Sequence, residues 1–193
     1  MASLKDMIKD SNKAMVSLTF WAGLRTQGVA QIQLSNDLTG YQITHYDTSA
    51  GLPEGEIWTF KLKGAVVFGT NKGLYKKVVE GKGKHKSYHF VPDSTLGSMF
   101  SDGTNDVFRL TEAPDKKVWL NAGSGNGIKL CPLQSDGTYL IDSIPFLPID
   151  IGQVNAIYPD PVQEEITWFG GNDGLVRYDA NVQKDYEPEY YCL

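Results

Sequence analysis

The sequence predicts an all-β protein built from several small antiparallel sheets that follow one another along the chain. Its 193 residues include 20 glycines and 9 prolines but only 21% charged residues, a composition typical of many short strands and turns. A Gly-bounded apolar motif recurs at nearly even spacing. No long segment has the 3.6-residue apolar period of an amphipathic helix, apart from a short run at Leu4–Lys9.

The recurring motif is a strand, a polar Gly/Asn turn and a second strand that restarts with Gly plus an aliphatic residue. The copies are FWAGLRTQGVAQI from Phe20, VVFGTNKGLYKK from Val66, VWLNAGSGNGIKL from Val118 and TWFGGNDGLVRY from Thr167. Their third anchor residues are 46, 52 and 49 residues apart: Gly23, Gly69, Asn121 and Gly170. This period matches the repeats of roughly 40 to 50 residues that form propeller blades. We therefore expect a β-propeller fragment of about four four-stranded antiparallel blades.

Each motif is expected to be the hairpin between the third and fourth strands of a blade. The Gly that restarts the chain suits a turn position with positive φ. A Trp at the first anchor position, such as Trp119, is expected to fill the space between neighbouring sheets. Burying one Trp, at ~200 Å² and ~25 cal/mol per Å², contributes about 5 kcal/mol as an upper bound.

The remaining strands are expected upstream of each motif, as a strand, a turn and a strand. The turns are Asp10-Ser11-Asn12, Lys63-Gly64, Ala113-Pro114-Asp115 and Asp160-Pro161. Connectors between blades are expected at 45–57, 85–103 and 144–157, where prolines such as Pro53 and Pro148 fix the local φ. The expected domain organisation is a partial propeller over 1–182 and a tail over 183–193.

Two stretches resemble the two-component regulator propeller repeat: HYDTSAGLPEGEIWTF…VVFGTNKGLYKK and GQVNAIYPDPVQEEITWFGGNDGLVRYD. The usual repeat begins with Gly-Leu-Pro and contains Trp-aliphatic-Gly-Thr followed by Gly-Leu-Tyr. The resemblance covers about residues 4–180. The chain departs from the pattern at 147–153, which lacks Gly-Leu-Pro, at Asn121 in place of Gly, and at Val67 in place of Trp. The closing YEPEYYCL is similar to the start of the tyrosine-rich β-sandwich module that follows such propellers.

The resemblance implies a non-enzymatic ligand-sensing or signal-relay segment in the periplasmic sensor region of a hybrid two-component histidine kinase. It implies an oligosaccharide as the ligand, and it carries over no catalytic or ligand-binding residues. The alternatives are a polysaccharide-active propeller enzyme (lyase or glycosidase) and a propeller scaffold that binds a protein partner.

The number of repeats bears on closure and assembly. Related propellers usually have seven blades, so four copies of the motif predict an open arc, the C-terminal piece of a larger propeller; a closed four-blade ring is the alternative. Apolar faces at the two ends of an open arc favour a homo-oligomer.

The net charge of −5 argues against a nucleic-acid partner. The basic run at 76–86 is expected to be a solvated loop, with contact to an anionic partner as the alternative. No segment approaches the ~18 apolar residues of a membrane span, and the N-terminus lacks the apolar core of a secretion signal. Cys131 and Cys192 are expected to be free thiols, although they could pair.

No catalytic motif, cofactor site or metal site is expected. The GSGNGI stretch at 123–128 precedes a strand and not a helix, which disfavours a phosphate cradle. His45, His85 and His89 show no metal-ligand pattern, and SDGTND at 101–106 is expected to be a turn because it lacks the closing acid of a calcium loop. Carboxylates that could serve a glycosidase are Asp160, Glu164, Glu165 and Asp173. Aromatic candidates for sugar stacking are Tyr41, Tyr46, Trp58 and Tyr158, for which core packing is the favoured interpretation.

Overall fold

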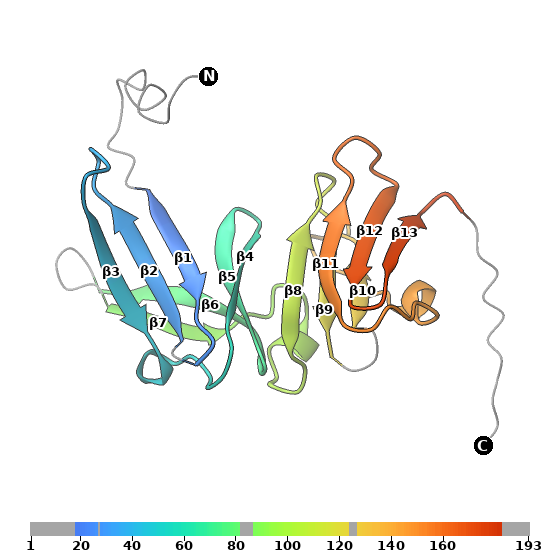
Figure 1. Ribbon diagram of the computed structural model, residues 1–193. Coiled ribbons are helices and arrows are strands. Elements are labelled where there is room, and N and C mark those ends of the chain that lie inside the picture. The colour runs from blue at the N-terminus through green and yellow to red at the C-terminus, as the bar shows by residue number, and fades with distance from the viewer. Residues whose placement is uncertain (1–17, 27, 82–86, 124–126, 183–193) are drawn as a thin grey trace.

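The computed structural model describes residues 18–26, 28–81, 87–123 and 127–182, and within them the chain is all-β. Its strands form four antiparallel sheets that follow one another along the chain. Figure 1 shows the first sheet at one end of the molecule and the last sheet at the other. The predicted open arc of propeller-like sheets is therefore confirmed. The run at 4–9, the turn at 10–12 and the tail at 183–193 lie outside the described residues.

Three of the sheets contain three strands each, and the second contains four. The first sheet consists of β1 (Thr19–Gly23), β2 (Val29–Leu34) and β3 (Tyr41–Tyr46). The second consists of β4 (Trp58–Leu62), β5 (Ala65–Thr70), β6 (Gly73–Glu80) and β7 (Ser87–Pro92). The third consists of β8 (Val107–Glu112), β9 (Val118–Ala122) and β10 (Ile128–Cys131), and an isolated bridge joins Leu130 of β10 to Asp142. The fourth consists of β11 (Val154–Pro159), β12 (Ile166–Gly171) and β13 (Leu175–Asp179).

All four copies of the sequence motif are β-hairpins, as predicted. They form the antiparallel pairs β1–β2, β5–β6, β9–β10 and β12–β13. Their position within the sheet differs from the prediction. In the four-stranded sheet, whose order is β4-β5-β6-β7, the hairpin joins the second and third strands, not the third and fourth. The sequence predicts a connector at 87–92, and this prediction is wrong: the segment pairs with β6 along its whole length and completes the sheet as β7.

Each sheet has a forward face, on the side of the next sheet along the chain, and a backward face, on the opposite side. At each of the three junctions, the forward face of one sheet packs on the backward face of the next. The first anchor residue points forward: Trp119 of the third sheet packs edge-to-face on Phe169 of the fourth, with ring centroids 5.3 Å apart. The second anchor residue points backward: Phe68 of the second sheet packs on Trp21 of the first, at 5.3 Å. Neighbouring residues of a strand point to opposite faces, so the first and second anchor residues of one strand pack at two different sheet junctions.

The protein core consists of three apolar clusters, one at each junction between consecutive sheets. The first junction contains Val29, Leu52, Ile57, Phe68 and Phe90. The second is the largest and includes Val67, Leu74, Phe100, Leu110 and Leu120. The third includes Trp119, Ile128, Phe146, Ile157 and Phe169.

The third anchor residue sets how closely two sheets approach. A Cβ atom on Gly69 would meet the carbonyl oxygen of Val107, at the start of the next sheet, so only glycine fits without a shift. Asn121 stands at the same place in the third sheet. Its Nδ2 donates a 2.7 Å hydrogen bond to the carbonyl oxygen of Val154, at the start of the fourth sheet. The departure from glycine at 121 therefore replaces a close backbone approach with a hydrogen bond.

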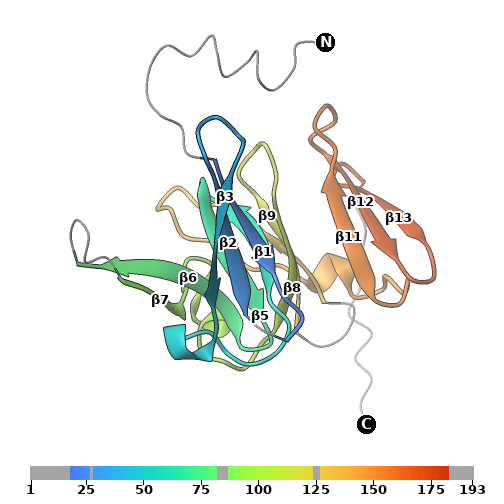
Figure 2. The same cartoon turned by 60° about the vertical axis from the view of Figure 1, so that its left-hand side comes forward.

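Each connector to the next sheet contains one turn of 3₁₀-helix, namely η1 (Thr48–Ala50), η3 (Ser98–Phe100) and η4 (Ile144–Phe146). Phe100 and Phe146 point into the second and third core clusters and are fully buried. An aspartate precedes each turn and accepts a hydrogen bond from the backbone N–H two residues later: Asp47 from Ser49, Asp93 from Thr95 and Asp142 from Ile144. Turned by 60°, the molecule still shows the fourth sheet well separated from the first (Figure 2).

Candidate functional site

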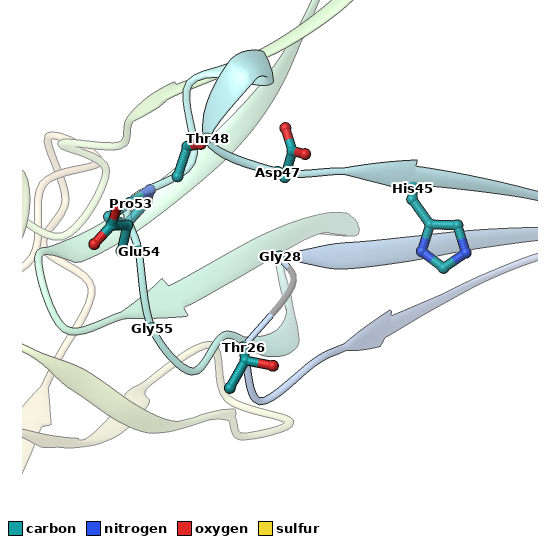
Figure 3. A pocket seen from close by; sticks show the side chains of 8 residues that line it. All are labelled: Thr26, Gly28, His45, Asp47, Thr48, Pro53, Glu54 and Gly55. Carbon is teal, nitrogen blue, oxygen red and sulfur yellow. The ribbon is translucent and has the colours of Figure 1, made fainter.

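A polar pocket lies at the connector end of the first sheet. Its volume is about 660 Å³, and it is lined by Thr26, Gly28, His45, Asp47, Thr48, Pro53, Glu54 and Gly55. Figure 3 shows that the lining residues come from three segments, namely the β1–β2 turn, the end of β3 and the connector to β4. A volume of this size is within the range of small-molecule sites, roughly 300–1,000 Å³.

The local folding of three segments builds this pocket. Gly28 closes the β1–β2 turn with a φ of 79°, and a Cβ atom there would meet the carbonyl oxygen of Tyr46, so the turn can lie directly against the end of β3. Asp47 then caps η1, which turns the chain towards Pro53 and Glu54. Leu52 lies between Asp47 and Glu54 in the sequence and is buried in the first core cluster, so it holds the connector against the core.

Asp47 is the most firmly oriented polar group of the pocket. Its Oδ1 accepts hydrogen bonds from the Ser49 backbone N–H at 2.9 Å and from the Ser49 hydroxyl at 2.6 Å. The hydroxyl bond and then the backbone bond lower the pKa of the Asp47 carboxyl below its usual 3.8. A carboxyl with a lowered pKa is ionised at neutral pH, so Asp47 can accept hydrogen bonds from a ligand but is unsuited to act as a general acid.

The three histidines do not form one site. His45 is exposed on β3 and lines the pocket. His89 lies on β7, where its Nε2 is 3.7 Å from Glu80. His85 lies outside the described residues. Among the residues that the structure describes, no group of three or more His, Cys, Asp or Glu side chains could hold a metal ion.

The acidic residues singled out from the sequence are separated by the fold. Asp160, Glu164 and Glu165 lie before β12, and Asp173 lies after it, at the opposite end of that strand. Asp160 caps its own turn, with Oδ1 accepting from the N–H groups of Val162 and Gln163. Asp173 is therefore separated from the other three carboxylates and cannot form a catalytic pair of the glycosidase type with any of them.

In the SDGTND stretch, Asp102 accepts from the backbone N–H and the hydroxyl of Thr104. This stretch is a turn, as predicted. The GSGNGI stretch leads into the strand β10, also as predicted, although its residues 124–126 lie outside the described part.

The four aromatic candidates divide into two pairs. Tyr46 is half-buried, stacks on Trp21 at 5.8 Å and donates a hydrogen bond to Gln31; Trp58 packs edge-on against Phe108 at 4.9 Å. Core packing is therefore confirmed for these two. It is wrong for Tyr41 and Tyr158, which are 72% and 57% exposed because they lie on the outer faces of the first and last sheets.

The basic run and the cysteines take structural positions. Residues 76–80 belong to β6 and not to a loop, and Lys77 lies over the rings of Trp21 and Tyr88 at 4.6 and 4.7 Å. Residues 82–86 of the run lie outside the described part. Cys131 is a fully buried free thiol whose pKa is raised by burial to about 12; Cys192 lies outside the described residues.

A second cavity of about 540 Å³ lies at the opposite end of the sheets from the connectors. It is lined by residues that include Lys61, Glu112 and Lys116. Lys116 forms an ion pair with Glu112 at 3.6 Å, and the Glu112 Oε2 accepts from the backbone N–H of Lys63. Glu112 and Lys116 are therefore paired with each other, and Lys61 is the remaining charged residue of this lining. The first pocket, at about 660 Å³, is the larger of these two cavities and is the better candidate site.

Sequence reasoning did not single out Thr26, Asp47, Thr48 or Glu54. A signal was present, because Asp followed two residues later by Ser or Thr recurs in consecutive connectors, at 47–49 and 93–95. This pattern predicts a capped turn at the same place in each repeat.

Comparison with known proteins adds no further assignment: no family model, no curated protein and no solved structure matches the chain. The described residues contain no helix long and apolar enough to cross a membrane.

Proposed function

We propose that the chain is a non-enzymatic ligand-sensing segment of a β-propeller, and that it binds an oligosaccharide at the connector end of its sheets. The parent protein would be a two-component regulator of the hybrid histidine kinase type, with this segment in the periplasm. The resemblance of its repeats to the two-component regulator propeller repeat motivates this assignment of the parent.

The observation that carries the proposal is the chemistry of the pocket around Asp47. Two carboxylates, one imidazole and two hydroxyl groups line it, contributed by Asp47, Glu54, His45, Thr26 and Thr48. This mixture of acceptors and donors suits the many hydroxyl groups of a sugar, each of which both donates and accepts. Two of the lining side chains carry negative charge, which disfavours strongly anionic ligands such as nucleic acid or phosphate.

Binding without catalysis is supported by the state of Asp47. Hydrogen bonds from Ser49 hold this carboxylate in one orientation and keep it ionised. A glycosidase needs one carboxyl with a raised pKa to protonate the leaving group, and Asp47 has the opposite shift.

Calorimetric titration with a panel of neutral and acidic oligosaccharides tests the proposal. We expect a neutral sugar to bind, and Glu54→Gln together with Thr26→Val to weaken its affinity by at least about tenfold, the loss expected when two ligand hydrogen bonds of about 1 kcal/mol disappear. Glu164→Gln changes an exposed carboxylate in the β11–β12 turn and serves as the matched control.

Two results would count against the proposal. Equal affinity in the double variant and the control would show that the sugar binds elsewhere. Release of new reducing ends from a polysaccharide by the wild-type chain would favour the enzyme alternative.

A further inference from the structure

The second cavity lies where the turns of the second and third sheets meet, at the end of the sheets away from the connectors. Its volume of about 540 Å³ is within the range of small-molecule sites, roughly 300–1,000 Å³. One wall comes from β4 and the β4–β5 turn, and the other comes from β8 and the β8–β9 turn. The strands β4 and β8 are neighbours in the arc (Figure 1). Both walls are therefore formed by consecutive sheets within the described residues.

The lining of this cavity is positively charged, unlike the chain as a whole. Its charged residues are two lysines and one glutamate, Lys61, Lys116 and Glu112, whereas the net charge of the chain is −5. Lys61 is exposed, and its ammonium group forms no ion pair or hydrogen bond with the described residues. The lining therefore favours a ligand with an anionic group.

Glu112 supplies an acceptor to this cavity, and one of its two carboxylate oxygens lacks a hydrogen bond. Oε2 accepts from the backbone N–H of Lys63 at 2.9 Å, which fixes the carboxylate. Oε1 is buried and has no hydrogen-bond partner in the described part of the chain. The Lys116 ammonium is 3.6 Å from Oε1, beyond the roughly 2.7–2.9 Å of a charge-assisted hydrogen bond. Because a buried acceptor without a donor is unfavourable, this oxygen marks a position for a ligand donor such as a hydroxyl group.

Lys116 covers this oxygen but is free to move. Its side chain is 65% exposed, whereas that of Glu112 is only 13% exposed. Exposed side chains change rotamer rapidly, so the ammonium can leave its place beside Oε1 and lie at the mouth of the cavity. In that position Lys116 and Lys61 can both contact an anionic group of a ligand.

We propose that this cavity binds a small hydroxylated carboxylic acid, the chemistry of a sugar acid. The ligand carboxylate contacts the ammonium groups of Lys61 and Lys116, and a ligand hydroxyl donates a hydrogen bond to Oε1 of Glu112. A neutral sugar supplies only the hydroxyl donor and a simple carboxylate supplies only the anion, whereas a sugar acid supplies both. The site is separate from the pocket around Asp47 and does not depend on the function proposed for that pocket.

Calorimetric titration of the full chain with glucuronate and with cyclohexanecarboxylate tests both contacts. The second ligand keeps a six-membered ring and the carboxylate but lacks the hydroxyl groups, so we expect it to bind at least about tenfold more weakly. Lys61→Gln removes one cationic contact and is expected to weaken glucuronate binding by about tenfold or more. Lys72→Gln is the matched control, because it removes the same charge from an exposed lysine in the β5–β6 turn, at the other end of β5. Circular dichroism checks that both variants are folded.

The variant Thr26→Val with Glu54→Gln separates this site from the first pocket. We expect it to bind glucuronate as the wild type does, because both changes lie at the connector end of the sheets. A loss of glucuronate binding in this variant, with none in Lys61→Gln, would place the acid in the first pocket and overturn the second site. The proposal is also overturned if glucuronate does not bind, if cyclohexanecarboxylate binds equally well, or if Lys61→Gln and Lys72→Gln bind glucuronate alike.

Discussion

At the scale of single residues, Asn121 shows how this chain tolerates a departure from its own repeat. In the first two sheets the third anchor residue is glycine, and the next sheet lies directly against it. In the third sheet, Asn121 is 6% exposed and its side chain bridges to the carbonyl oxygen of Val154. The amide therefore satisfies a buried acceptor at the junction that holds the fourth sheet.

We expect Asn121→Ala to lower the free energy of unfolding by about 1–3 kcal/mol, because the carbonyl of Val154 would lose its buried partner. Urea unfolding followed by circular dichroism measures this change. Asn155→Ala is the matched control: its side chain donates to Asn172 in an exposed bond, so the expected cost is within about 0.5 kcal/mol. Equal midpoints for the two variants would show that the buried amide contributes nothing to the junction.

At the scale of elements, the sequence predicts the hairpins better than the outer strands. The hairpins have a strong local signal, because a buried strand reads as an apolar run and the glycines mark the turns. The segments 41–46 and 87–92 contain polar residues at every second or third position, such as Thr44 and His89, because an edge strand is covered on fewer sides. Such a segment differs little from a connector in sequence, and β7 was therefore missed.

The pocket could not be predicted for a related reason. Thr26, His45, Asp47 and Glu54 come from three separate segments, and their proximity depends on how the connector folds over the end of the first sheet. The capped turn at Asp47 is visible in the sequence, but its position relative to the β1–β2 turn is a property of the packed sheet.

Capped turns also make the stability of these elements depend on pH. Hydrogen bonds from the Ser35 hydroxyl, then from the hydroxyl and backbone N–H of Thr39, lower the pKa of Asp37 from 3.8 to about 2. The unfolded chain then binds a proton more readily than the folded one. The stabilisation is present above about pH 4 and is lost as the pH falls towards about 2.

We therefore expect the urea midpoint of the wild type to fall between pH 4 and pH 2, and Asp37→Asn to fall less steeply over the same range. The same direction of shift at Asp47, Asp102, Asp136 and Asp160 adds to the fall in both proteins. Glu164→Gln removes an exposed carboxylate outside these turns and serves as the control. The interpretation fails if Asp37→Asn and the wild type lose stability in parallel.

At the scale of the whole molecule, the even spacing of the motif was sufficient to predict an arc of similar sheets. Each unit contacts only its neighbours, so the period in the sequence becomes a period in space. The sequence did not predict that the first anchor residue packs on the following sheet and the second on the preceding sheet. Alternation along a strand shows that the two residues point to opposite faces, but it does not show which sheet each face contacts. This division follows from the three junctions taken together, and it explains why Tyr41 and Tyr158 are exposed although similar positions elsewhere are covered.

This division predicts that equivalent tryptophans contribute unequally to stability. Trp119 is 4% exposed and packs on Phe146 and Phe169, so Trp119→Ala is expected to cost about 3–5 kcal/mol. Trp168 has the same repeat position but only a half-covered ring, and Trp168→Ala is expected to cost no more than about 2 kcal/mol, since less apolar area leaves water on folding. The comparison is made by urea unfolding at a concentration where light scattering gives the mass of one chain, so that any contact between copies is absent. Similar costs at the two positions would mean that the forward face of the last sheet is already packed within the monomer, and that the arc ends differently from the way its repeats indicate.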